Sequence, residues 1–173
     1  MAIEQTLVLV KPDGDQRGLI GEVIKRFEQR GLKIVGLKLT KIDKDFSQKH
    51  YTDDIEKRRG KEVRDRLIDY ITSDPVVAMV VEGVDAIDNV RKLGGETESK
   101  SAIPGTIRGD FSHVSFNHAD EKKIPIKNII HASGNAEDAK HEVALWFSID
   151  ELHSYKRVEE DQVFWNPDNK ILL

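Results

Sequence analysis

Several polar and charged side chains stand where predicted strands and helices end, and their types suit the chemistry of phosphate groups. They are Lys11, Tyr51, Arg91, Thr97, Arg108, Asn128 and His131. Arginine can hold phosphate oxygens through two parallel hydrogen bonds, and lysine acts as a compact positive charge. A neutral imidazole placed among them can attack phosphorus as a nucleophile. In one cleft these residues would bind a polyphosphate, although spacing alone does not show that they converge.

The chain lacks the motifs of the common phosphate-binding and metal-dependent enzymes. It has no G-x-x-x-x-G-K-[ST] loop, because Gly60-Lys61 is followed by Glu62, and no G-x-G-x-x-G, H-E-x-x-H or G-x-S-x-G. It also contains no cysteine, which excludes disulfides, thiolate catalysis and cysteine zinc sites. His113 and His118 lie in a polar segment without a rigid frame, so we interpret them as solvated rather than as metal ligands.

Length and charge set the broad class. The 173 residues suit one compact domain, and the formal net charge of −4, from 27 basic and 31 acidic residues, argues against a nucleic-acid partner. Glu4 interrupts any apolar start, so no signal peptide is expected. The apolar runs are too short to span a bilayer. We therefore expect a cytoplasmic protein with no nucleic-acid or membrane partner.

The elements that must position these side chains alternate along the chain. Short apolar runs predict strands over residues 6–10, 32–42, 75–83 and 126–131. Helical spacing predicts helices over residues 18–31, 61–72 and 85–95, with Asp85 as an N-cap, and a last helix with the stripe Ala139, Val143, Trp146 and Phe147. The resulting β-α-β-α-β-α-β-α order fits either a doubly wound parallel sheet or a ferredoxin-like mixed sheet. Periodicity does not choose between them.

Two segments fall outside this alternation. Residues 112–127, "SHVSFNHADEKKIPIK", are polar and charged and predict a surface insertion before the fourth strand. The chain from residue 154 has no clear period; Phe164, Trp165 and residues 171–173 favour an arm that packs on a neighbour. The charged run "EKRRGKEVRDR" is interpreted as a solvated face, and the less favoured alternative is that it guards the mouth of a nucleotide site.

The chain resembles the nucleoside diphosphate kinase family along nearly its full length. The matching stretches are "TLVLVKPDG", "RGLIGEVIKRFEQRGLKIVGLKL", "HY" at residues 50–51, "PVVAMVVEG", "GETESKSAIPGTIRGDF" and "NIIHASGNAEDAKHEVALWF". The last two stretches are the most specific. The spacing from "KPD" through "PGTIRGDF" to "NIIH-x-S" has no common rival.

The resemblance implies an α/β (α+β) fold: a ferredoxin-like βαββαβ core with a four-stranded mixed sheet, extra helices and a C-terminal arm. The kinase domain would span residues 1–153, and residues 154–173 would pack on a neighbouring subunit. The family transfers the γ-phosphate of a nucleoside triphosphate, mainly ATP, to any nucleoside diphosphate by a ping-pong mechanism, which maintains nucleotide pools. It uses Mg²⁺ carried on the nucleotide, with no metal ligand in the protein. Members form homohexamers or tetramers, and the arm favours the hexamer.

The resemblance also implies a role for each site residue. His131 would be the phosphorylated nucleophile, Glu142 would hold its other ring nitrogen, and Ser133 would support the site close to Glu142. The remaining catalytic and nucleotide-binding residues divide by the part of the nucleotide they contact: Lys11, Tyr51 and Arg108 at the transferred phosphoryl group, Arg91 and Thr97 at the α- and β-phosphates, and Lys11 with Asn128 at the sugar hydroxyls.

The chain departs from the family pattern around the base. Family members usually stack an aromatic ring on the base from the segment after the tyrosine, yet residues 52–74 contain no Phe or Trp. Val63 aligns nearest to that ring, and Leu67 matches a family apolar contact. Stacking contributes roughly 1–3 kcal/mol per base in nucleic-acid systems, so base affinity is expected to be weaker unless Phe116 in the insertion supplies a face. Ala132 stands where Gly is usual, and Gly134 where Asp is usual.

Two other functions compete with the kinase. A catalytically weak paralogue that only binds nucleotides predicts the loss of a motif residue, and the key residues are all present. A nucleic-acid-binding ferredoxin-like domain would need exposed aromatics on its strands, and "TLVLV", "VVAMVV" and "NIIH" contain none.

Overall fold

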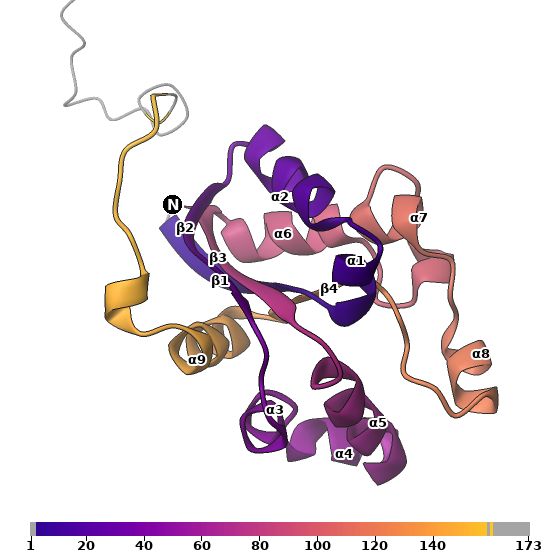
Figure 1. Ribbon diagram of the computed structural model, residues 1–173. Coiled ribbons are helices and arrows are strands. Elements are labelled where there is room, and N and C mark those ends of the chain that lie inside the picture. Colours follow the sequence, from indigo (N-terminus) through magenta and orange to yellow (C-terminus); the bar gives the residue numbers. More distant parts are fainter. Residues whose placement is uncertain (1–2, 159, 161–173) are drawn as a thin grey trace, which may run out of the picture.

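The four strands in the described part of the chain form one antiparallel sheet in the order β2-β3-β1-β4 (Figure 1). The computed structural model describes residues 3–158 and residue 160 of the 173 residues. The strands are β1 (Ile3–Val10), β2 (Lys33–Thr40), β3 (Val76–Val84) and β4 (Ile130–Ala132). β3 pairs with both β2 and β1, and β4 pairs with β1.

This pairing confirms the ferredoxin-like βαββαβ fold and corrects one part of the prediction, the mixed sheet. β1 and β2 run in the same direction, because each is antiparallel to β3, but β3 lies between them. The helical crossover after β1 therefore leaves a gap that β3 fills, as in a split βαβ unit. No two hydrogen-bonded neighbours among the described strands are parallel. The doubly wound alternative, which needs a parallel sheet, is wrong.

Helices cover both faces of the sheet, which explains why its strands are continuous apolar runs. The covering helices are α2 (Ile20–Gln29), α3 (Lys44–His50), α5 (Lys61–Ile71), α6 (Ala86–Gly94) and α9 (Ala136–Trp146). Val8 and Val10 of β1 pack with residues of α2 and α6 on one face. Leu7 and Leu9 pack with residues of α5 and α9 on the other, and Figure 1 shows the two layers. This two-residue alternation within one buried strand creates two separate cores.

Several short helices were not predicted from the sequence. Besides α3 they are α1 (Pro12–Gln16), α4 (Asp53–Arg59), α7 (Ile107–Phe111), α8 (Phe116–Glu121) and the 3₁₀ turns η1 (Ser99–Ser101) and η2 (Ile149–Glu151). Each spans about two turns or fewer, too short for a periodic pattern to stand out. α8 lies inside the predicted insertion, where the Ser115 side chain caps it by accepting a hydrogen bond from His118 N. At α6, Asp85 occupies the predicted N-cap position, but its side chain makes no capping hydrogen bond.

The chain after α9 returns along β2. His153 N donates to the Val35 carbonyl at 2.7 Å, and the Tyr155 hydroxyl donates to the Ile34 carbonyl at 2.8 Å. Most of the predicted arm over residues 154–173, including Phe164, Trp165 and residues 171–173, lies outside the described residues. Among the described helices, none has the length and apolar character needed to cross a membrane.

Candidate active site

His131 lies in β4 directly opposite Leu9 of β1, so both side chains lie on the sheet face covered by α9. The His131 side chain is 23% exposed, which leaves its ring accessible from solvent. The fourth strand was predicted over residues 126–131 and is shorter, starting at Ile130. The structural reason is a tight turn immediately before it.

The backbone of that turn is strained at Ile129. Ile129 has a φ of 71°, a left-handed conformation that costs energy for a β-branched residue, and Ile130 N donates to the Asn128 carbonyl at 2.8 Å, which closes a γ-turn. Asp13 holds the turn by accepting from Ile129 N at 3.0 Å, and the Tyr70 hydroxyl donates to the same carboxylate. The strain persists because these buried contacts fix it, and it turns the chain between Asn128 and the strand that carries His131.

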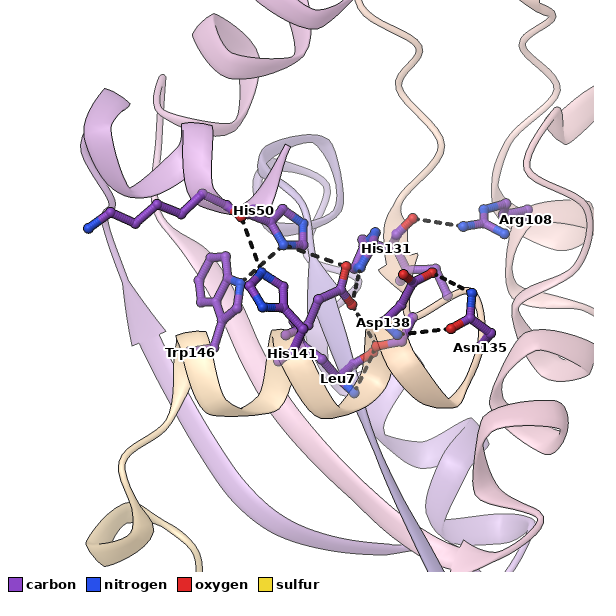
Figure 2. Close-up of polar contacts among 12 residues, drawn as sticks. Leu7, His50, Arg108, His131, Asn135, Asp138, His141 and Trp146 are labelled. Carbon is purple, nitrogen blue, oxygen red and sulfur yellow. Dashed lines mark hydrogen bonds and ion pairs between the residues drawn. The ribbon is translucent and has the colours of Figure 1, made fainter. Parts of the chain in front are cut away.

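Glu142 of α9 orients the His131 ring, and Figure 2 shows the His131 side chain over this helix. Its Oε2 lies 2.9 Å from His131 Nε2 and also accepts a hydrogen bond from the Ser133 hydroxyl at 2.6 Å. Burial would raise the pKa of Glu142, but the electrostatic interaction and hydrogen bond with His131, together with the Ser133 hydroxyl, outweigh it and lower that pKa to about 2. An ionised carboxylate can only accept, so the Nε2 atom carries the proton. The Nδ1 atom of His131 therefore keeps its lone pair for chemistry.

A second histidine, His50 of α3, packs behind His131. The two rings meet edge to face with centroids 4.5 Å apart, and Trp146 Nε1 donates to His50 Nδ1 at 3.3 Å. Burial and the neighbouring His131 lower the pKa of His50 to about 3, so His50 is neutral at physiological pH. Sequence reasoning noted the "HY" dipeptide and gave His50 no role. Its only sequence signal was its place beside Tyr51.

Lys11, which directly follows β1, is the buried cation of the site. Its ammonium donates to the Asn128 side-chain oxygen, and Asn128 Nδ2 in turn donates to the Thr97 carbonyl at 2.6 Å. Burial lowers the pKa of Lys11 to about 7; the charge of Asp13 opposes this effect and that of Arg108 adds to it. A buried ammonium with so low a pKa is poised to gain an anionic ligand.

Arg108 of α7 is the second buried cation. Its guanidinium donates to three backbone carbonyls, those of Gly95 at 2.6 Å, Ile130 at 2.9 Å and Asn128 at 3.2 Å. Burial, then the charge of Arg91, lowers the pKa of Arg108 to about 10, so it stays charged at neutral pH. Arg108 thus ties the loop at Gly95 to the strained turn and brings a positive charge close to His131.

One cavity of about 460 Å³ gathers most of the predicted site residues. Those that line it are Lys11, Tyr51, Val63, Leu67, Thr97, Arg108, Asn128 and His131. Arg91 lines an adjoining cavity of about 510 Å³ that shares Thr97 and Arg108 with the first. Glu142 and Ser133 line neither cavity and contact each other beside the His131 ring. Tyr51 is buried, and burial followed by the charge of Glu142 raises the pKa of its hydroxyl, which therefore stays protonated.

The cavity has further lining residues that were not among the predicted site residues. Arg58, Arg59 and Arg66 come from α4 and α5, within the run that we interpreted as a solvated face. Asp120 comes from α8 in the insertion, and so does Phe116, which the sequence offered as an alternative face for the base. Their contribution depends on how α8 packs against α4 and α5, which no local pattern encodes.

The charges of the cavity favour an anion over a metal ion. Five cationic side chains, Lys11, Arg58, Arg59, Arg66 and Arg108, line it, and Asp120 is the acidic lining residue among those described. The one cluster of potential metal ligands in the described residues is His50, His131 and Glu142, whose ligand atoms lie within 4.8 Å of one another. Hydrogen bonds engage one atom of each: His131 Nε2 with Glu142 Oε2, and His50 Nδ1 with Trp146 Nε1. The arrangement can bind a polyanion and present it to His131 Nδ1.

Comparisons with known proteins agree on one family. The family model described as Nucleoside diphosphate kinase matches residues 4–152. The Nucleoside diphosphate kinase of Borreliella burgdorferi is 49% identical over 166 residues, which cover 95% of this chain and 99% of that protein.

Solved structures give the same result in three dimensions. The transition state mimic of nucleoside-diphosphate kinase from Borrelia burgdorferi with bound vanadate and ADP matches with a TM-score of 0.93 and 49% identity, covering 95% of this chain and 98% of that chain. A halophilic nucleoside diphosphate kinase from Halobacterium salinarum in complex with CDP matches with a TM-score of 0.80 and 41% identity, covering 94% and 99%.

Proposed function

Because this chain belongs to the nucleoside diphosphate kinase family, we propose that it transfers the γ-phosphate of a nucleoside triphosphate to a nucleoside diphosphate through a phosphohistidine at His131. The observation that carries the proposal is the orientation of this ring. Glu142 occupies Nε2, and the ring lines a cationic cavity with Lys11 and Arg108. ATP is the proposed main donor, and maintenance of nucleotide pools is the proposed role.

The first half-reaction forms one bond and breaks another. The Nδ1 lone pair of His131 attacks the γ-phosphorus, while the bond from phosphorus to the β–γ bridging oxygen breaks and its electron pair leaves with the nucleoside diphosphate. Since Nε2 keeps its proton, the phosphorylated ring is cationic, and the adjacent Glu142 carboxylate stabilises it. A second diphosphate then attacks the same phosphorus, which restores the neutral ring.

The residues around His131 supply charge and alignment, which are the main requirements of phosphoryl transfer. We assign Lys11, Tyr51 and Arg108 to the transferred phosphoryl group, since all three line the cavity with His131. Arg91 and Thr97 are assigned to the α- and β-phosphates; Thr97 belongs to both cavities and so connects Arg91 to the reaction centre.

Contacts to the sugar and base complete the assignment. We assign Lys11 and Asn128, which are hydrogen-bonded to each other, to the sugar hydroxyls. Val63 and Leu67 line the cavity as an apolar surface for the base. Apolar contact does not read the edge of a base, so the site is expected to accept different bases.

Magnesium fits this site as part of the substrate. The single described lining carboxylate, Asp120, is already paired with two arginines, so the cavity offers no free acidic oxygen to a divalent cation. We therefore propose that Mg²⁺ enters bound to the nucleotide phosphates, where it neutralises part of their charge.

Steady-state kinetics test the proposed double displacement. With ATP as donor and GDP as acceptor, we expect parallel lines in double-reciprocal plots, because the first product leaves before the second substrate binds. Intersecting lines would show that both nucleotides bind together, which contradicts transfer through His131.

Replacing Glu142 with alanine is expected to reduce kcat by about 10²–10⁴-fold or less, since orientation and charge stabilisation are lost while the nucleophile remains. Glu142→Gln is the matched variant: its amide oxygen can still accept from Nε2 of His131, so it should lose less than Glu142→Ala. Single-turnover measurements of the phosphorylation step compare the two. Unchanged phosphorylation in Glu142→Ala would rule out the assigned role.

Assembly and location remain proposals. We propose a homohexamer, on the basis of the family and the C-terminal arm, and sedimentation velocity would test it. We also propose a cytoplasmic location, which cell fractionation would test.

A further inference from the structure

Residues 112–127 form one wall of the cavity proposed to bind the nucleotide. Their lining side chains are Phe116, Ala119, Asp120, Ile124, Pro125 and Ile126. Val63 and Leu67 of α5, the apolar residues assigned to the base, also line the cavity. Because residues 52–74 contain no Phe or Trp, a base in this cavity depends on apolar surface from both sides.

Three hydrogen bonds hold the first half of this wall, one across the base of the segment and two to residues 98 and 100. Ser112 Oγ donates to the Lys127 carbonyl at 3.2 Å, which closes the base of the segment. Lys100 N donates to the Val114 carbonyl at 3.1 Å. Phe116 N, at the start of α8, donates to Glu98 at 2.8 Å.

The second half of the wall is held by Arg66 of α5. Arg66 Nη1 donates to the carbonyls of Ala119 at 3.3 Å and Ile124 at 3.4 Å, and its Nη2 lies 3.2 Å from Asp120 Oδ1. The Ala119 carbonyl in the last turns of α8 also accepts from Ile124 N at 2.9 Å, so Arg66 adds a second hydrogen bond at the end of α8 and connects α8 to α5. Its side chain is only 16% exposed, which favours a defined geometry.

Asp120 joins two arginines on different helices. Besides Arg66, it pairs with Arg59 of α4 at 3.4 Å, and the Arg59 guanidinium lies 4.2 Å from the centre of the Phe116 ring. α4, α5 and α8 therefore meet at one carboxylate beside the cavity, and Figure 1 shows α8 next to α5. Asp120 also neutralises arginine charge that would otherwise be available to phosphate.

We propose that Asp120 is a positioning residue for nucleotide binding, which holds the wall formed by residues 112–127 against the nucleoside by pairing with Arg59 and Arg66. The inference rests on the proposed function, because it takes a nucleoside di- or triphosphate as the ligand. Asp120 does not contact His131, so its removal should weaken nucleotide binding and leave the phosphoryl-transfer step unchanged.

The test compares ADP with inorganic pyrophosphate, which has no nucleoside. In Asp120→Ala we expect the dissociation constant of ADP to rise about five-fold, the size expected from losing a small network of partly exposed ion pairs. Pyrophosphate should bind no more weakly, since Arg59 and Arg66 lose their counter-ion. KM for ADP should rise in step with the dissociation constant of ADP, whereas kcat should stay within about two-fold.

Two variants serve as controls. Glu121→Ala removes the same charge from the next, exposed position of α8 and should leave ADP binding unchanged. Asp120→Glu keeps the carboxylate and should recover part of the lost affinity. If Asp120→Ala does not fold, Asp120→Asn keeps the shape of the side chain and removes only its charge.

Two results would overturn the proposal: unchanged ADP affinity in Asp120→Ala, or an equal loss of affinity for ADP and pyrophosphate, which would indicate a general effect on the fold. Both readouts are equilibrium binding measurements by calorimetry. A failure of the proposed function would instead appear as absent phosphoryl transfer in the unsubstituted enzyme, whatever the binding contrast shows.

Discussion

Replacing His131 with glutamine is expected to reduce phosphoryl transfer by more than about 10⁴-fold, because the variant has no nucleophilic nitrogen to accept the phosphoryl group. Glutamine keeps a polar group near Glu142, so the cavity should retain its shape. ADP should therefore bind with nearly the same affinity, since Lys11, Arg108 and Asn128 remain in place. Transfer from ATP to GDP and ADP calorimetry measure the two effects separately.

The matched control for this variant is His141→Gln. His141 is exposed on α9, one residue before Glu142, and it does not line the cavity. This control should retain full activity. If His131→Gln transferred phosphate at a rate within ten-fold of the unsubstituted enzyme, a direct transfer between two bound nucleotides would replace the phosphohistidine mechanism.

Replacing Lys11 with methionine is expected to lower kcat/KM by about 10²–10³-fold, the usual effect of removing one preorganised donor that stabilises transition-state charge. Methionine fills much of the same volume as lysine. The loss of kcat/KM therefore measures the effect of the missing charge rather than the effect of an empty space in the site. Lys127→Met, an exposed lysine directly before Asn128, is the control and should behave as the unsubstituted enzyme. A loss smaller than about three-fold in Lys11→Met would remove Lys11 from the reaction centre.

The lowered pKa of Lys11 also predicts the direction in which kcat/KM changes with pH. A lysine is charged below its pKa, so raising the pH through about 7 removes the positive charge of Lys11 from the free enzyme. The kcat/KM profile reports the free enzyme, and it should fall above about pH 7. The advantage of the unsubstituted enzyme over Lys11→Met should shrink over the same range. A constant ratio between about pH 6 and about pH 9 would contradict this role.

Much of the core could be predicted from local patterns, because its strands and long helices carry their own signals. β3 is a run of buried residues on both faces, and α2 buries Val23 and Phe27 at helical spacing. The direction of pairing could not be predicted, because it depends on β3 lying between β1 and β2. Periodicity within a strand does not contain that information.

Only the site residues that belong to the family motifs could be predicted from the sequence. The family motif pointed to His131 and Glu142, and the structure places their side chains 2.9 Å apart. The positive φ of Ile129 was not predictable, since a β-branched residue disfavours it and contacts from the distant Asp13 and Arg108 maintain it. The role of Arg66 at α8 was hidden for a similar reason, because its contacts join residues more than fifty positions apart.

Intact-mass spectrometry after mixing the protein with ATP and Mg²⁺ tests the central claim most directly. We expect one added phosphoryl group per chain, attached to His131, labile in acid, and lost when ADP is added. The same treatment should leave His131→Gln unmodified. An active enzyme that never gains this group, or that carries it on another residue, would contradict the account.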